Sequence, residues 1–273
     1  MNKLKKIAVI NDLSGSSRCS LTVAMPIIAA RGLQCCIMPT AILSNHTGYK
    51  HYFFDDYTEK MEYFTQNWQK QNLSFDGIYT GFLGSEHQIE VVKDFIKKFA
   101  KQNTKLIVDP VMGDDGKIYT TYTHSMCVAI KKIAAHADVV TPNITEGSVL
   151  ADVPYTSEFI SEQQAVDICT KIHALGAKNV VLTGVKNKDT ISNYVFDGRQ
   201  TKKYSCPLMP TYFSGTGDVF SSIVASDVTK GKSIFESVEF ATNYVHKVTQ
   251  YSQNAGLTWE EGICIEKFIK ELI

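Results

Sequence analysis

Short apolar runs alternate with longer stretches of helical spacing along most of this chain. The apolar runs predict strands, and apolar residues three or four positions apart predict helices. The predicted strands span residues 7–10, 34–39, 77–80, 106–108, 138–140 and 180–183. The predicted helices span residues 21–30, 56–71, 85–100, 217–229, 234–251 and 260–272. Buried apolar strands that alternate with helices are typical of a parallel sheet with helices on both faces.

The pattern changes near residue 190. Two strand-like segments, residues 191–196 and 201–206, flank Asp197-Gly198-Arg199, which has the composition of a hairpin turn. No linker, repeat or low-complexity segment interrupts the chain. We therefore predict one α/β domain over residues 1–273, folded as a three-layer α/β/α sandwich with a central, mostly parallel sheet.

Polar and glycine residues follow one predicted strand after another. They lie at residues 11–18, 44–49, 80–84, 109–114, 141–146 and 183–184. In open α/β sheets, ligands bind beyond the carboxyl ends of the strands, where such segments meet. The sequence therefore predicts one ligand site along this edge.

The segment Ser214-Gly215-Thr216-Gly217-Asp218 combines two glycines with a carboxylate at the start of a predicted helix. The free N–H groups of a helix start bind phosphate, and glycines let the backbone approach it closely. A carboxylate beside them can accept the proton of an attacking hydroxyl. Phosphoryl transfer to an alcohol needs both parts. By itself the segment fits equally well an ordinary loop in which Asp218 favours the helix start.

Composition excludes several other classes of function. Lys plus Arg and Asp plus Glu number 28 each, and no basic stripe indicates nucleic acid. No apolar run is long enough for a signal peptide or a membrane span. The seven cysteines include no Cys-x-x-Cys pair, and the seven histidines have no ligand spacing. We expect a cytoplasmic protein with neither disulfides nor a transition-metal site.

Several ordered segments resemble the pyridoxal kinase branch of the ribokinase-like superfamily. They are Leu43-Ser44-Asn45-His46-Thr47-Gly48-Tyr49, Thr80-Gly81-Phe82-Leu83-Gly84, Asp109-Pro110-Val111-Met112-Gly113, Thr141-Pro142-Asn143 with Glu146, and Gly215-Thr216-Gly217-Asp218. The resemblance covers roughly residues 5 to 250. Ser-Asn-His-Thr is its most diagnostic part for vitamin B6, whereas Gly-Thr-Gly-Asp is shared with related sugar and pyrimidine kinases.

The resemblance implies an ATP-dependent kinase for the 5′-hydroxymethyl group of pyridoxal, pyridoxamine or pyridoxine, acting in pyridoxal 5′-phosphate salvage as a homodimer. Asp218 would be the catalytic base, and the N–H groups of Gly215, Thr216 and Gly217 would form the anion hole. Asp109 and Glu146 would hold Mg²⁺ with ATP, partly through water. A monovalent cation is a further candidate cofactor. The remaining ATP-side positions would be Thr141, Asn143 and Thr183.

On the vitamin side, the resemblance assigns Thr47 and Gly48 to the pyridine ring's surroundings. Asp12 stands where the family usually has a serine, with Ser14 as a substitute, and Phe82 replaces a tyrosine. These differences leave the preferred vitamer open. His46 is a candidate base, although a loop histidine is more often structural. Residues 113–122 fit a mobile cover of the site and a simple surface loop about equally well.

Two other functions are compatible with these motifs. A hydroxymethylpyrimidine kinase shares the fold and the Asp218 chemistry, but some members carry a cysteine where Ser214 stands here. A catalytically silent protein that binds pyridoxal phosphate is the second alternative. Such a binding protein would not need Asp218 as a base.

Overall fold

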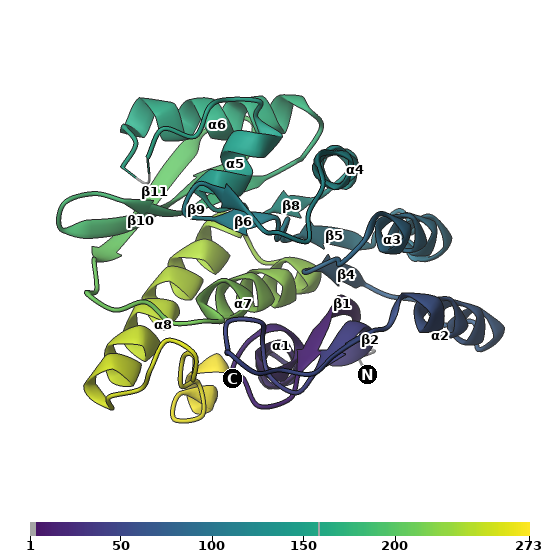
Figure 1. Ribbon diagram of the computed structural model, residues 1–273. Helices are drawn as coiled ribbons and strands as arrows, with labels where there is room; N and C mark the ends of the chain where they lie inside the picture. The colour runs from purple at the N-terminus through teal and green to yellow at the C-terminus, as the bar shows by residue number, and fades with distance from the viewer. Residues whose placement is uncertain (1–3, 158) are drawn as a thin grey trace.

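One nine-stranded sheet forms the centre of the computed structural model, which describes residues 4–157 and 159–273 (Figure 1). Its strand order is β11-β10-β9-β8-β5-β4-β1-β2-β3. The strands are β1 (Lys6–Ser14), β2 (Gln34–Leu43), β3 (Phe54–Asp56), β4 (Gly77–Thr80), β5 (Lys105–Val108), β8 (Val139–Val140), β9 (Val180–Lys186), β10 (Thr190–Phe196) and β11 (Thr201–Pro207). The six strands from β9 to β2 in this order run parallel, while β3, β10 and β11 are antiparallel additions at the edges.

Helices cover both faces of the sheet, which confirms the three-layer sandwich (Figure 1). The helices are α1 (Ser20–Ala30), α2 (Thr58–Lys70), α3 (Glu86–Phe99), α4 (His124–Ala134), α5 (Ile144–Leu150), α6 (Glu162–Ala174), α7 (Thr216–Lys230) and α8 (Ile234–Asn254). Helices α1, α7 and α8 pack on one face, and α2 to α6 pack on the other. No helix within these described ranges is long and apolar enough to span a membrane.

The alternation of side chains in β1 divides the core between the two layers. Ile7 and Val9 belong to the apolar cluster with α1, α7 and α8, whereas Ala8 and Ile10 belong to the cluster on the opposite face. All four side chains are fully buried. This parity places Asn11, the next residue of the first set, toward α7, because successive side chains of a strand point to opposite faces.

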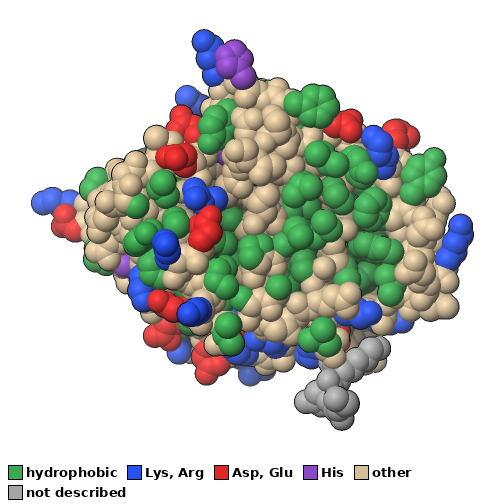
Figure 2. Space-filling view, turned by 90° about the horizontal axis from the view of Figure 1, so that it is seen from below, with side chains coloured by type: hydrophobic (Ala, Val, Ile, Leu, Met, Phe, Trp, Pro, Cys, Tyr) green, Lys and Arg blue, Asp and Glu red, His purple; other side chains and the backbone are tan. Residues whose placement is uncertain are grey.

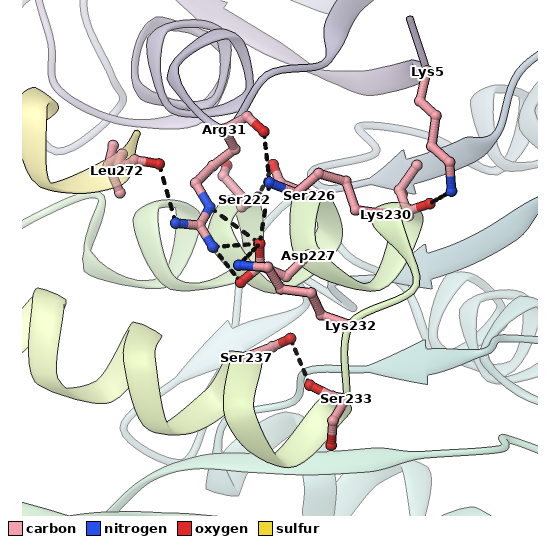
Figure 3. Close-up of polar contacts among 11 residues, drawn as sticks. Lys5, Arg31, Ser222, Ser226, Asp227, Lys230, Lys232, Ser233, Ser237 and Leu272 are labelled. Atoms are coloured by element: carbon pink, nitrogen blue, oxygen red, sulfur yellow. Dashed lines mark hydrogen bonds and ion pairs between the residues drawn. The ribbon is translucent and has the colours of Figure 1, made fainter. Parts of the chain in front are cut away.

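A buried ion pair joins the C-terminal ends of α1 and α7 (Figure 3). The guanidinium group of Arg31 binds the Asp227 carboxylate through Nε at 3.1 Å and through Nη2. Its Nη1 donates to the Leu272 carbonyl oxygen at 3.1 Å, and its plane lies over the Phe240 ring. Buried charges are tolerated when paired and hydrogen-bonded in this way. The cluster fixes α7 against α1 at the end remote from Gly215.

The predicted helix at residues 260–272 is wrong. Only Ile269–Leu272 forms a single 3₁₀ turn, η1. Gly262 has a φ of +74°, which interrupts a helix, and the next residue donates its N–H to the Ser214 carbonyl oxygen at 3.3 Å. The Ser214 N–H in turn donates to the Trp259 carbonyl oxygen at 3.1 Å. Tertiary contacts with the loop that precedes α7 thus hold this segment in turns and irregular backbone instead of a helix.

Other boundaries differ from the sequence-based expectations. The first strand continues through Asn11, Asp12 and Ser14, with an irregular register against β2 between Asn11 and Leu13. The strand predicted to end at Thr183 continues to Lys186. The sequence pattern missed β3 and the two-stranded hairpin of β6 (Gly113–Asp114) and β7 (Lys117–Ile118). These strands are too short to carry a periodic pattern.

Candidate active site

The start of α7 presents free backbone donors without a side-chain cap. Gly215 is the N-cap residue, with a φ of +82°, and no side chain accepts from the first turn. A Cβ at this position would lie 1.9 Å from the Arg18 carbonyl oxygen, so only glycine fits. The first N–H groups of a helix have no intrahelical partner and carry the positive end of the dipole. This helix start is therefore suited to an anion.

Gly217, in contrast to Gly215, is free of backbone strain and of close neighbours. Its backbone φ lies outside the left-handed region, and a Cβ built on it meets no atom within 4 Å. Local backbone geometry therefore does not require glycine here. The open space above Gly217 is available to a ligand that approaches the N–H groups.

Asp218 occupies the first turn of α7 and is only partly exposed. Asn11 Nδ2 donates to its Oδ1 at 3.2 Å, and the Ser20 backbone N–H is a second donor. Burial raises the pKa of Asp218 from 3.8 to about 6, and the neighbouring Asp12 carboxylate adds to the rise, whereas both hydrogen bonds lower it. A carboxylate with a pKa near neutrality is a suitable general base.

Asp12 lies beside Asp218 and is held by two hydroxyl groups. Ser14 Oγ donates to Asp12 Oδ2 at 2.8 Å, and Ser20 Oγ donates to Oδ1 at 2.5 Å. Burial raises the pKa of Asp12, because it is only 7% exposed. Ser14 thus orients Asp12 in this structure. Ser20, whose φ is +50°, was not identified from the sequence.

Asp109 follows β5 and faces the same helix. Burial, and then the nearby Glu146 and Asp218 carboxylates, raise the pKa of Asp109 well above its usual value. Hydrogen bonds from Ser221 and Thr141 oppose this rise. Thr141 Oγ1 and Ser221 Oγ are themselves 3.0 Å apart. No sequence motif points to Ser221, since a serine in a helix interior carries no distinctive pattern.

Glu146 and Asn143 form a reciprocal cap at the start of α5. Asn143 Oδ1 accepts from the Glu146 N–H at 2.9 Å, and Glu146 Oε2 accepts from the Asn143 N–H at 2.9 Å. Glu146 Oε1 also accepts from the Met112 N–H at 3.1 Å, and Asn143 Nδ2 donates to the Gly113 carbonyl oxygen at 2.8 Å. Burial raises the pKa of Glu146 to about 7 despite these bonds.

The carboxylates of Asp109 and Glu146 fit a hydrated Mg²⁺ ion. Both are buried and carry raised pKa values, so a cation would offset the cost of their ionised forms. Among the described residues, no three His, Cys, Asp or Glu side chains converge as metal ligands. Mg²⁺ does not require such a set, because it keeps several waters and binds through one or two carboxylates plus substrate phosphates.

Thr183 lies next to the segment that carries Thr141 and Asn143. Its N–H and its Oγ1 both contact the Pro142 carbonyl oxygen, at 2.8 and 3.2 Å. The following Gly184 has a φ of +71° and donates its N–H to Asn193 Oδ1 at 3.1 Å. The two Thr183 contacts join β9 to the segment after β8, and the Gly184 bond joins β9 to β10.

The loop of residues 44–53 carries the predicted vitamin-side residues. The Gly48 N–H donates to His46 Nδ1 at 3.1 Å, so His46 donates from Nε2 to the Glu260 carbonyl oxygen at 3.0 Å. Both ring nitrogens thus bind backbone groups, one within the loop and one in the C-terminal segment, which supports a structural role for His46. A Cβ on Gly48 would meet the Trp259 ring at 2.3 Å. Thr47, which lies between His46 and Gly48 in the sequence, is exposed.

The β6–β7 hairpin borders the site within residues 113–122. Its turn is anchored to α5, because the Gly116 N–H donates to Thr145 Oγ1 at 2.8 Å. Farther along, the Tyr122 ring packs edge-on against Phe82, with centroids 6.3 Å apart. Cavities of about 300 and 440 Å³ are lined by other residues, from α5, α6 and strands β9 to β11. The candidate site is therefore defined by its converging side chains and not by either of these two cavities.

Comparisons with known proteins identify the family of this chain. The family model for phosphomethylpyrimidine kinase matches residues 27–261. A Bacteroides thetaiotaomicron protein with the provisional name phosphomethylpyrimidine kinase is 37% identical, with a TM-score of 0.96 over 99% of this chain and 94% of that one. A second crystal form of that protein, with pyridoxal, gives 36% identity and a TM-score of 0.92 over 99% and 96%.

Curated relatives include a pyridoxine kinase and an enzyme of thiamine biosynthesis. The Bacillus subtilis pyridoxine kinase is 29% identical over 63% of this chain and 63% of its own length. The Arabidopsis thaliana thiamine biosynthetic bifunctional enzyme TH1 is 24% identical over 93% of this chain and 48% of its own length. The chain thus spans less than two thirds of either enzyme. These matches confirm the resemblance to pyridoxal kinases of the ribokinase-like superfamily.

Proposed function

The chain belongs to the phosphomethylpyrimidine kinase family, and we propose that it is an ATP-dependent kinase for a vitamin B6 vitamer. The acceptor would be the 5′-hydroxymethyl group of pyridoxal, pyridoxamine or pyridoxine. The observation that carries the kinase chemistry is the Asp218 carboxylate in the first turn of an uncapped helix. Pyridoxal in the structure of a 36% identical relative supports the vitamer, as does the Ser44-Asn45-His46-Thr47 segment.

The reaction needs one proton acceptor and one cradle for the transferred group. The 5′-oxygen attacks the γ-phosphorus of ATP, the bond to the β,γ-bridging oxygen breaks, and the hydroxyl proton passes to Asp218. The N–H groups around Thr216 and Gly217 stabilise the charge on the transferred phosphoryl group. Asp109 and Glu146 would hold Mg²⁺, which neutralises phosphate charge when bound.

Hydroxymethylpyrimidine is the alternative acceptor, because the family model is that of phosphomethylpyrimidine kinase and a Haemophilus influenzae relative, 29% identical over 68% of this chain and 70% of its own length, is a hydroxymethylpyrimidine/phosphomethylpyrimidine kinase. A test is to supply pyridoxal, pyridoxamine and hydroxymethylpyrimidine separately with Mg²⁺ and ATP and to measure ADP formation. We expect turnover with at least one B6 vitamer at a higher kcat/KM than with the pyrimidine. The reverse order would reassign the substrate, and no ADP with any acceptor would refute the kinase.

We also propose that residues 1–273 form one kinase domain that assembles as a homodimer. Helix α1 contains no charged residue, and its Met25 is 39% exposed. Tyr52 and Phe53, just before the edge strand β3, and Phe54, its first residue, are 47%, 64% and 42% exposed. Figure 2 shows hydrophobic side chains gathered on this face. Large exposed apolar patches mark interaction sites.

Light scattering of the native protein and of Phe53→Asp tests this assembly. We expect a dimer that the substitution weakens, because a charge would be buried at the interface. A native monomer at micromolar concentration would refute the homodimer.

A further inference from the structure

Asn11 is a polar residue at a core-facing position of β1. It continues the set of Ile7 and Val9, which pack under α1 and α7, and it is only 1% exposed. A buried amide is costly unless it is hydrogen-bonded. An apolar residue would satisfy the packing at this position without that cost. A buried asparagine at this position therefore indicates a role that needs its hydrogen-bonding groups.

The hydrogen bonds of Asn11 define the orientation of its amide. Oδ1 accepts from the backbone N–H groups of Asp12 at 3.0 Å and Phe82 at 2.9 Å. Because an N–H group cannot accept these bonds, the NH₂ group must be the end that faces Asp218. Nδ2 donates to Asp218 Oδ1 at 3.2 Å.

Gly81 leaves the space that this amide occupies. A Cβ at Gly81 would lie 2.5 Å from the side-chain amide of Asn11. Any larger residue would push the amide out of its position between β4 and α7. The backbone just after β4 and the side chain of Asn11 thus fit each other closely at the edge of the sheet that faces Asp218.

We propose that Asn11 is the positioning residue of the catalytic base: its amide ties the Asp218 carboxylate to the backbone of Phe82. This inference rests on the proposed kinase function. The Asp12 and Phe82 N–H groups fix the amide, and the amide fixes one carboxylate oxygen. The other oxygen is left to receive the proton of the acceptor hydroxyl. The Ser20 N–H supports the same carboxylate from the α1 side.

Two substitutions separate positioning from packing. Asn11→Asp keeps the acceptor for the Asp12 and Phe82 N–H groups but removes the donor to Asp218. Asn11→Ser shortens the side chain, so that its hydroxyl no longer reaches Asp218, and adds no charge. A displaced catalytic group of this kind costs up to about 100-fold in rate. We expect kcat to fall by about 10- to 100-fold in both variants, while the Kd values for pyridoxal and for a non-hydrolysable ATP analogue stay unchanged.

Asn179→Asp is the matched control. Asn179 Nδ2 donates to the Asp138 carbonyl oxygen at 2.8 Å, at the opposite edge of the sheet, where β8 and β9 begin. The same loss of a donor there should leave kcat and both Kd values unchanged, whatever it does to the melting temperature. Thermal unfolding of all variants shows whether they are folded.

A double-mutant cycle with Asp218→Asn gives the decisive result. If Asn11 acts through Asp218, then Asn11→Ser reduces single-turnover phosphorylation in the parent but has no further effect in the Asp218→Asn background. An equal loss in both backgrounds, a loss confined to the Kd values, or no loss in the parent would each overturn the inference. Lack of activity in the parent itself is a separate outcome that refutes the proposed function, and the inference falls with it.

Discussion

Replacing Asp218 by asparagine should inactivate the enzyme and stabilise the free protein. Asparagine preserves the size of the side chain and can accept from Asn11 and Ser20, but it cannot take the acceptor's proton. General-base contributions are about 10²–10⁴-fold, so kcat should fall by that order while ATP and vitamer binding persist. Retention of near-normal kcat in the folded variant would mean that Asp218 is no base.

The stability change follows from the raised pKa of Asp218. The folded-state pKa is about 6, against 3.8 as the ordinary value, so folding disfavours the ionised form. The stabilisation from the protonated carboxyl is fully present below pH 3.8 and is lost as the pH rises through about 6. At pH 7.5 the charge therefore costs up to about 3 kcal/mol, at about 1.36 kcal/mol per pKa unit. The neutral amide of the Asp218→Asn variant avoids this cost.

Chemical denaturation of the ligand-free protein at pH 7.5 and pH 4.5 measures this effect. We expect Asp218→Asn to be more stable than the parent at pH 7.5 and to lose most of that advantage at pH 4.5. Asp167→Asn on the exposed side of α6 is a matched control that should change neither stability nor kcat. A variant that is less stable than the parent at pH 7.5 would contradict the electrostatic account of Asp218.

Three further predictions concern the rest of the site. Asp109→Asn and Glu146→Gln should raise the KM for Mg²⁺-ATP more than the Kd for the vitamer, because each removes a charge that balances the cation. Unchanged kinetics at low Mg²⁺ would mean that Asp109 only ends a strand and that Glu146 only caps a helix. Asp12→Ser should lower kcat/KM for pyridoxamine relative to pyridoxal, because it removes an acceptor-only charge suited to an amine; an unchanged ratio would place Asp12 outside the vitamer pocket. Gly215→Ala should impair folding, since its Cβ would meet a backbone oxygen at 1.9 Å. Gly217→Ala should fold normally but weaken ATP binding and turnover. Equal melting temperatures for the two variants would contradict this interpretation.

The sequence predicted the sheet and its helical layers because buried strands and amphipathic helices carry strong local patterns. Residues 77–80 were predicted as a strand with the bounds that β4 has. The predicted hairpin around Asp197-Gly198-Arg199 is also present, with Gly198 at a φ of +88°. In contrast, the segment at residues 260–272 has helical spacing but forms turns and irregular backbone, held by backbone hydrogen bonds with Ser214. Local pattern cannot reveal such a long-range contact.

The site was predictable where a residue belongs to a motif, as with Asp218, Asp109 and Glu146. Asn11 and Ser20 were missed as partners of Asp218 because their roles depend on geometry. The role of Asn11 follows from strand parity combined with the position of α7, and that of Ser20 from a backbone φ of +50°. The structure also shows that Asn143 and Glu146 cap each other, which the sequence alone leaves open.

The identity of the phosphorylated product distinguishes a vitamin B6 kinase from a hydroxymethylpyrimidine kinase. The protein is incubated with Mg²⁺, limiting ATP and equal concentrations of pyridoxal, pyridoxamine and hydroxymethylpyrimidine, and the products are identified by ³¹P NMR and mass spectrometry. We expect most of the phosphate as an ester on the 5′-oxygen of a B6 vitamer, and we expect Asp218→Asn to form little of it. Phosphate found mainly on hydroxymethylpyrimidine, or on none of the three acceptors, would contradict the account.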